Sequence, residues 1–335
     1  MRRRPAVVLV LALALGLAAC GNGDGDDRPE RPKTTTTVPR PSTTVTSTIL
    51  LPATTLRPVL TVPASGPARA LVTPTGVVAP VLGGGPGAWR VRTPCGETAT
   101  VAGGMPVPGA VVVLDPGHGG VEPGAVGPNG LAEKELNLLV TQHTQAALEA
   151  NGVNVLLTRT ADYRITLRSR AEIATTMKPA AFVSIHHNGD PDGPRDEPGT
   201  ETYYQIGSPA SKRLAGLIYE EVVAALSAYE APWVADTDAG AKYRLNDQGG
   251  DYYGILRHSA GVPSVLAELA FVNAPEADLL ARPDVQRAEG EAVARGIVRF
   301  LTTDDPGSGY VTPYPRETPA GGGGGAQGCV DPPLS

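Results

Sequence analysis

The sequence predicts an α/β fold in which one main domain, residues 109–303, has a mostly parallel central sheet flanked by helices. The first observation is that short apolar runs alternate with longer stretches of helical periodicity from Gly109 onward. The second is that 41% of the 335 residues are hydrophobic, which is enough for one sizeable core plus accessory segments. The third is that Gly (41) and Pro (33) together exceed a fifth of the chain, so a considerable part must be loop or linker.

Residues 1–19 have the pattern of an export signal. A positive run, Arg2–Arg4, precedes a largely apolar stretch, Ala6–Ala19, which is too short for a comfortable membrane span. The stretch ends in Leu-Ala-Ala-Cys, which resembles the bacterial lipobox, in which the cysteine (here Cys20) is lipidated and the preceding segment is removed. The alternative is an ordinary secretory signal with an incidental cysteine. Either way we expect a protein that works outside the cytoplasmic membrane, lipid-anchored at Cys20 and facing the cell wall, or secreted.

Three further segments surround the main domain. Residues 20–66 are rich in Thr and Pro and have few side chains to bury, so we expect a disordered tether. Residues 67–108 contain short alternating runs broken by Pro and a glycine triplet, which predicts a small β-hairpin or a three-stranded cap. The chain is again rich in Gly and Pro after Thr302, so residues 304–335 are predicted to be a flexible tail.

Four strands and four helices are expected within the main domain. The strands are Val111–Leu114, Val153–Leu157, Ala181–Ile185 and Val262–Leu266. The helices are Glu133–Ala150, Leu167–Met177, Pro209–Ala228 and Asp284–Leu301. Ser208 followed by Pro209 predicts the start of the third helix, and Asn151 followed by Gly152 predicts the end of the first.

The net charge of −6 argues against nucleic acid as a partner. Binding to nucleic acid needs a concentrated face of Lys and Arg, and no basic run follows the first few residues of this chain. The charge alone does not identify a substrate.

The cysteines predict one disulfide. After Cys20 only Cys95 and Cys329 remain, in a compartment that permits disulfides, and Cys329 lies on a Gly-rich tail that could fold back to the 67–108 cap. The alternative is two independent free cysteines. Neither cysteine belongs to a Cys-x-x-Cys pair, so a metal, if present, must be held by His and Glu.

Four short segments carry side chains that indicate an enzyme. They contain His118 in Asp-Pro-Gly-His-Gly-Gly, Glu133 in Glu-Lys-Glu-Leu-Asn-Leu, His186 in Ser-Ile-His-His-Asn and Glu268 in Glu-Leu-Ala-Phe-Val-Asn. Two His and one Glu, with water in the fourth position, are the ligand set of an open catalytic zinc, and the last Glu could be a general base. His118, His186 and Glu268 each come at or just after the end of a predicted strand, so they could converge on one edge of the sheet.

Several of these and neighbouring residues have structural alternatives. Glu133 could simply stabilise the N-terminus of its helix. An unpaired Glu268 at the end of an apolar run would be costly, so it needs a metal-bound water or a salt bridge to an arginine. His187 should point to the strand face opposite the candidate ligand beside it and is expected at the rim. His143 is expected to be solvated, and His258 to line the pocket or cap a turn.

The four segments resemble the zinc-dependent N-acetylmuramoyl-L-alanine amidases of the family often called amidase 3, in the same order and across about residues 110–302. The resemblance implies that His118, Glu133 and His186 bind one zinc ion (Zn²⁺) per chain. It also implies that Glu268 is the catalytic acid/base.

The sequence departs from the family pattern at two positions that are not ligands. His187 stands where a small residue is usual, and the spacing from the fourth-motif Glu to Asn273 is shorter. The resemblance also implies that autolytic members carry a helix-bearing insertion that plugs the site until a partner removes it. Here residues 203–207 run straight into the helix after Ser208, so residues 231–251 are the only sizeable loop expected beside the cleft.

We therefore expect a zinc-dependent hydrolase that cuts the amide bond between N-acetylmuramic acid and L-alanine in peptidoglycan. It should act on peptidoglycan and muropeptides as a monomer, with no nucleic-acid partner. Two alternatives remain open: a non-catalytic peptidoglycan-binding lipoprotein, and a zinc peptidase that cuts peptide cross-links.

Overall fold

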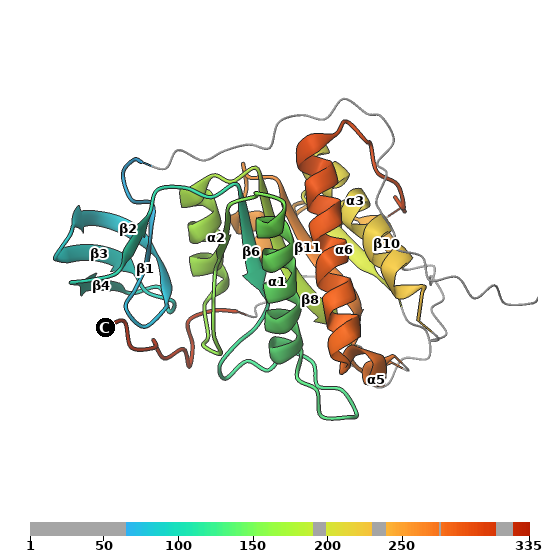
Figure 1. Cartoon of the computed structure of the whole chain (residues 1–335), viewed down its shortest axis with the longest axis horizontal. Helices are drawn as coiled ribbons and strands as arrows, with labels where there is room; N and C mark the ends of the chain where they lie inside the picture. The colour runs from blue at the N-terminus through green and yellow to red at the C-terminus, as the bar shows by residue number, and fades with distance from the viewer. Residues whose placement is uncertain (1–64, 190–198, 230–238, 275, 313–323) are drawn as a thin grey trace, which may run out of the picture. The chain divides into compact units, whose positions relative to one another are not determined.

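The computed structural model describes residues 65–189, 199–229, 239–274, 276–312 and 324–335, which all belong to one compact unit (Figure 1). The predicted export signal and residues 20–64 of the predicted tether lie outside the described residues. None of the helices in the described ranges is both long and apolar enough to cross a membrane.

A six-stranded sheet forms the centre of the main domain, in the order β10-β9-β11-β8-β6-β7. Its strands are β6 (Val112–Pro116), β7 (Val155–Leu157), β8 (Ala181–Asn188), β9 (Glu201–Tyr204), β10 (Gly240–Lys242) and β11 (Ser264–Phe271). Neighbouring strands are parallel except for β9 and β11, which are antiparallel. The predicted mostly parallel sheet is therefore corrected to a mixed one. The two reversed strands, β9 and β10, were not predicted because they are short and are not continuous apolar runs.

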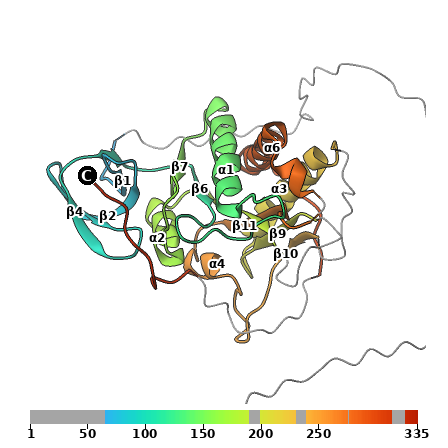
Figure 2. The ribbon, with the colours of Figure 1, turned by 90° about the horizontal axis from the view of Figure 1, so that it is seen from below.

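Helices cover both faces of this sheet. The first face carries α1 (Glu133–Ala150), α3 (Pro209–Leu226) and α6 (Pro283–Thr302) (Figure 2). The short α5 (Ala277–Leu280) lies beside α6. The second face carries α2 (Leu167–Met177) and α4 (Gly254–His258). Strand β6 shows the division, since Val112 and Leu114 belong to the core under α1 and Val113 to the core under α2. Because both faces are buried, the central strands read as nearly continuous apolar runs.

The helix boundaries follow local signals in the sequence. Helices α1 and α2 begin and end at the predicted residues. The Ser208 side chain accepts a hydrogen bond from the backbone N–H of Ser211, and Pro209 begins α3, which confirms that predicted start. Asn151 ends α1 as predicted, and Gly152 follows with a φ of 75°, a conformation that glycine adopts readily.

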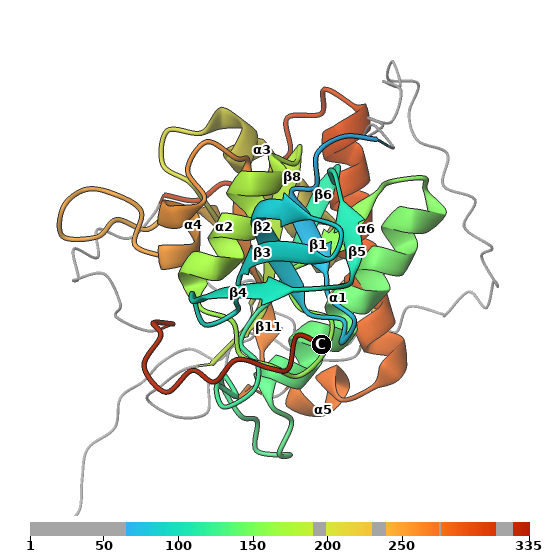
Figure 3. The same cartoon turned by 90° about the vertical axis from the view of Figure 1, so that its left-hand side faces the viewer.

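A second, smaller sheet precedes the main domain and packs on α2 (Figure 3). Its strands are β1 (Ala70–Val72), β2 (Val78–Gly85), β3 (Ala88–Arg92), β4 (Thr98–Val101) and β5 (Met105–Val107). They pair antiparallel in the order β4-β3-β2-β1-β5, around a small core that includes Leu71, Trp89 and Val91. The sequence predicted a hairpin or three strands. The additional strands are short and one contains Pro106, so their pattern is too weak to identify.

The described parts of residues 304–335, predicted to be a flexible tail, make specific contacts with the rest of the chain. Ala241 on β10 exchanges backbone hydrogen bonds with Gly309 at 2.8 Å and Val311 at 3.2 Å. Farther along, a disulfide joins Cys95 to Cys329, which confirms the predicted pairing. A Gly- and Pro-rich composition indicates loop structure, but it does not reveal contacts that distant parts of the chain make with that loop.

Candidate active site

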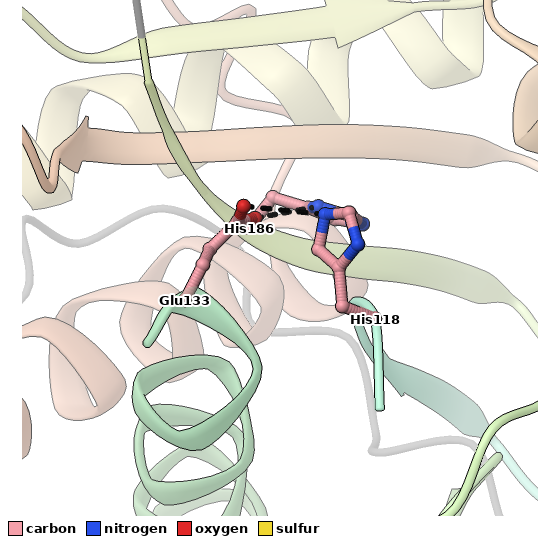
Figure 4. A group of neighbouring side chains, drawn as sticks. All are labelled: His118, Glu133 and His186. Carbon is pink, nitrogen blue, oxygen red and sulfur yellow. Dashed lines mark hydrogen bonds and ion pairs between the residues drawn. The ribbon is translucent and has the colours of Figure 1, made fainter. Parts of the chain in front are cut away.

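Three candidate residues from distant parts of the sequence lie together (Figure 4). His118 follows β6, Glu133 is the first residue of α1, and His186 lies near the end of β8. His118 Nε2 lies 3.2 Å from Glu133 Oε2, and His186 Nδ1 lies 3.0 Å from Glu133 Oε1. Their possible ligand atoms all fall within 4.8 Å of one another, so this cluster could hold a metal ion.

Two glycines allow the backbone to pass close to this cluster. A Cβ atom at Gly117 would lie 2.3 Å from the His186 ring, and a Cβ atom at Gly124 would lie 2.3 Å from Glu133 Oε2. A larger residue at either position would therefore displace a member of the cluster. His118 itself has a φ of 58°, a left-handed conformation that is uncommon for residues other than glycine.

Two buried arginines fix the backbone that carries His118. Arg159 donates hydrogen bonds to the carbonyl oxygens of Pro116 at 3.0 Å and Gly117 at 2.8 Å. Arg170 donates to the carbonyl oxygens of Pro116 at 2.6 Å and His118 at 2.5 Å. Sequence reasoning missed both arginines, because nothing in their local pattern distinguishes them from the usual solvated arginine.

Arg170 is in turn paired with a carboxylate inside the core. Asp115, on β6, is fully buried, and its Oδ1 lies 2.7 Å from Arg170 Nη1. Thr158 and Ser184 also donate hydrogen bonds to this carboxylate. Burial would raise the pKa of Asp115, but the Arg170 charge and these hydrogen bonds hold it below its usual value.

The carboxylate of Glu133 is held in its ionised form. The backbone N–H of Ala125 donates to its Oε2 at 2.9 Å and the Asn137 amide donates to its Oε1 at 3.2 Å. Burial would raise the pKa of Glu133, but the hydrogen bonds from His118 and His186 outweigh burial and hold it well below its usual value. Burial lowers the pKa of His186. Ionised carboxylates and neutral imidazoles are the forms of these groups that bind metals.

His187 does not lie at the rim, where the sequence analysis placed it. It points to the face opposite His186, as the alternation of a strand requires, but that face is covered by helices and His187 is fully buried. Its Nδ1 lies 2.8 Å from Asn137 Oδ1, and its Nε2 lies 3.4 Å from Glu289 Oε1 on α6. The error came from treating this end of β8 as exposed on both faces.

Glu268 lies on β11, between His186 on β8 and Glu201 on β9 in the strand register. Its Oε2 atom is buried and has no hydrogen-bond partner among the described residues. Burial, followed by the negative charges of Glu133 and Glu201, raises the pKa of Glu268 well above its usual value. A structural salt bridge would not leave such an atom unsatisfied. A buried carboxyl group of this kind beside a candidate metal cluster is typical of a functional acid or base.

The cluster opens into a cavity of about 460 Å³ that His118 and His186 line. Tyr252 and Tyr253 contribute to its walls, as does Gly324 of the C-terminal tail. Of the predicted flanking loop, residues 231–238 lie outside the described part of the chain. Sequence reasoning did not identify the two tyrosines or the tail as parts of the site.

Comparison with known families agrees with this geometry. Residues 112–299 match the family model described as N-acetylmuramoyl-L-alanine amidase. The chain belongs to this family. The match contains the His118, Glu133, His186 and Glu268 positions, so the main domain is an N-acetylmuramoyl-L-alanine amidase domain. The β1–β5 cap and the C-terminal tail lie outside the matched residues.

Individual relatives support the assignment. The chain is 36% identical over 216 residues to the uncharacterized protein YqiI of Bacillus subtilis, covering 62% of this chain and 95% of YqiI. It is 34% identical over 199 residues to the N-acetylmuramoyl-L-alanine amidase LytC of the same organism, covering 58% of this chain but only 36% of LytC. The chain is 27% identical to an N-acetylmuramoyl-L-alanine amidase from Clostridium difficile 630 whose crystal structure is known. The two structures match with a TM-score of 0.50, over 58% of this chain and 97% of the Clostridium difficile chain.

Proposed function

We propose that the chain is a zinc-dependent amidase that hydrolyses the bond between N-acetylmuramic acid and L-alanine in peptidoglycan. The observation that carries this proposal is the convergence of His118, Glu133 and His186 near Glu268, whose buried Oε2 atom has no hydrogen-bond partner among the described residues, within the matched family region. The protein would act as a monomer on peptidoglycan strands or on soluble muropeptides.

The residues present fit a zinc ion. The donor set of two imidazole nitrogens and one carboxylate is typical of a catalytic zinc site with an open position. The unsatisfied Oε2 atom of Glu268 indicates that a further polar group belongs beside it. His118, Glu133 and His186 would hold the ion. When bound, zinc would polarise the substrate carbonyl and make water a stronger nucleophile at neutral pH.

Glu268 would move the protons. Its carboxylate accepts a proton from the attacking water, and the resulting carboxylic acid donates that proton to the amine of L-alanine as the C–N bond breaks. The raised pKa of Glu268 supports this role, because a carboxylate with a raised pKa accepts a proton more readily than an ordinary carboxylate does. Arg159 and Arg170 position the backbone of His118 and do not contact the reacting atoms.

The fragments released from muropeptides test this function. Purified protein should release intact peptides that begin with L-alanine, together with peptide-free muramic acid, and mass spectrometry identifies both. Shortened peptides would instead indicate a peptidase that cuts cross-links. Binding without any cleavage would indicate the non-catalytic lipoprotein. The Glu268→Gln variant, with zinc, is the control for contaminating hydrolases.

We also propose that the protein works outside the cytoplasmic membrane, anchored by a lipid at Cys20. The Cys95–Cys329 disulfide supports an oxidising compartment, where such bonds persist. Labelling cells with a radioactive fatty acid should mark the wild-type protein and not the Cys20→Ser variant. Equal labelling of the two proteins would contradict the anchor.

A further inference from the structure

A second cavity, of about 790 Å³, adjoins the one at the metal cluster. The two cavities share Leu167 at the start of α2, Gly254 at the start of α4, and Gly324 of the tail as lining residues. The remaining walls of the second cavity come from the β1–β5 cap, the exposed side of α2, the end of α4 and residues 324–326. A ligand that fills both cavities would pass beside these three shared residues.

The part of the tail that lines both cavities is held by hydrogen bonds and a disulfide. The backbone N–H of Leu167 donates to the Gly324 carbonyl oxygen at 3.0 Å. Arg164 donates to the carbonyl oxygens of Gly325 at 2.8 Å and Gln327 at 2.5 Å. The disulfide then ties Cys329 to Cys95 of the cap, which itself lines the second cavity. The shared wall is therefore a defined part of the fold.

Much of this cavity is built from residues outside the family match. The cap and the tail both lie beyond residues 112–299, whereas α2 and α4 lie within them. Residues outside the family match thus contribute much of a pocket next to the candidate active site. An addition that contacts the cavity of the reaction centre can influence which substrates reach that centre.

The charged side chains that line the second cavity leave one part of its wall positively charged. This part, the cationic corner, is formed by Arg168 and Arg257. Arg92 of the cap is paired with Glu172 of α2 at 3.2 Å, and these two charges offset each other. Arg168 of α2 is exposed, and Arg257 of α4 donates to the neutral carbonyl oxygen of Asp251 at 2.9 Å.

His258 lines the same cavity, and its pKa is lowered by burial and then by the charges of Arg168 and Arg257. The other lining acid is Glu97 of the cap, which is exposed.

We propose that this second cavity binds the acidic peptide part of a muramoyl peptide substrate. Arg168 and Arg257 bind one carboxylate of that peptide. This inference rests on the proposed function, because the peptide must extend from the amide bond held at the metal cluster. A peptide chain supplies carboxylates for a cationic corner, whereas a neutral sugar does not. Among the described residues that line this cavity there is no Phe, Tyr or Trp to stack against a sugar ring.

Two matched substrates test the pocket in the full-length protein loaded with zinc. One is a muramoyl peptide with free side-chain and terminal carboxylates, and the other is the same compound with those carboxylates converted to carboxamides. The Arg168→Gln variant should reduce the ratio of kcat/KM for the acidic over the amidated substrate about fivefold, the scale of one exposed charge pair. Arg287→Gln, which removes an exposed arginine on α6 that does not line either cavity, should leave this ratio unchanged.

A second variant tests the tail independently of Arg168. Cys329→Ser removes the tie to the cap and should raise KM for the acidic substrate more than for the amidated one. If both variants leave the ratio at its wild-type value, the pocket does not bind the peptide carboxylate and the inference is overturned. The inference is also overturned if a neutral disaccharide competes with the substrate and the free peptide does not.

The failure of the proposed function would have a different outcome. In that case the wild-type protein would hydrolyse neither substrate. Binding of the free acidic peptide, measured by calorimetry, then tests the pocket without any hydrolysis. Weaker binding to Arg168→Gln than to the wild type and Arg287→Gln would support the pocket, and equal binding to all three proteins would overturn it.

Discussion

Arg170 and His118 are joined by a hydrogen bond of 2.5 Å from the guanidinium Nη2 to the backbone carbonyl oxygen of His118. The same guanidinium is ion-paired with the buried Asp115, so one side chain links the core of the sheet to the loop that carries a candidate metal ligand. The conformation of His118, with its positive φ, therefore depends on the ion pair between Asp115 of β6 and Arg170 of α2.

Replacing Arg170 should affect both the fold and the metal site. Arg170→Ala leaves the Asp115 carboxylate buried without its partner, and breaking such a pair costs about 3–5 kcal/mol in the free energy of unfolding. We also expect weaker zinc binding, because the His118 carbonyl loses its donor. Denaturant unfolding and zinc titration measure the two effects, with Arg287→Ala as the matched control. Wild-type zinc affinity in a folded Arg170→Ala protein would contradict the link.

The Asp115–Arg170 pair should also affect how the free energy of unfolding falls at acid pH. Because the folded pKa of Asp115 lies below its unfolded value of about 3.9, this group stabilises the fold above that pH. The stabilisation is lost as the pH falls through the folded pKa. Unfolding measured from pH 7 downward should show a steeper loss below about pH 4 in the wild type than in Asp115→Asn, which is less stable throughout. Parallel curves would contradict the role of this carboxylate.

The roles of Glu268 and of the three-residue cluster can be separated by metal content. Glu268→Gln should lower hydrolysis at least about a hundredfold, the usual scale for a general acid or base, and should retain one zinc per chain. His118→Ala and His186→Ala should lose both zinc and activity, whereas His143→Ala, on α1 outside the cluster, should keep both. Loss of zinc from Glu268→Gln would make Glu268 a ligand and overturn its assigned role.

The sequence allowed much of this site to be predicted, for a physical reason. The candidate ligands and their glycine neighbours form short local motifs, and the strands and helices that carry them have strong periodicity. The convergence of His118, His186 and Glu268 could therefore be inferred from the expected strand ends, whereas Glu133 was added by the family resemblance.

The supporting residues could not be inferred, because their roles come from tertiary contacts. Arg159 and Arg170 resemble solvated arginines until the structure places them against the backbone of residues 116–118. The burial of His187 depends on α6, which lies about a hundred residues away in the sequence. The tail was expected to be flexible for the same reason, since its contacts are with Leu167, Cys95 and Arg164.

The disulfide should stabilise the protein substantially. It joins residues 234 positions apart, and in the chain-entropy model closing so long a loop contributes about 5 kcal/mol, although measured values are often smaller. Reduction, or Cys95→Ser with Cys329→Ser, should lower the Tm by several degrees. Thiol titration of denatured, non-reduced Cys20→Ser protein should find no reactive thiol. Two reactive thiols in protein exported to an oxidising compartment would rule the bridge out.

Finally, the enzyme should not need an activator to expose its site. Autolytic relatives are expected to carry a plugging insertion, but here only Gln205–Ser208 separate β9 from α3, and the described connection forms a tight turn in which the Ser208 N–H donates to the Gln205 carbonyl oxygen. The candidate metal cluster instead opens into its cavity directly. Purified protein with one equivalent of zinc should therefore hydrolyse muropeptides at once, and Glu268→Gln under the same conditions should not. If the zinc-loaded wild type is inert until a partner protein is added, the site must be blocked by a segment other than the β9–α3 connection, and this prediction is wrong.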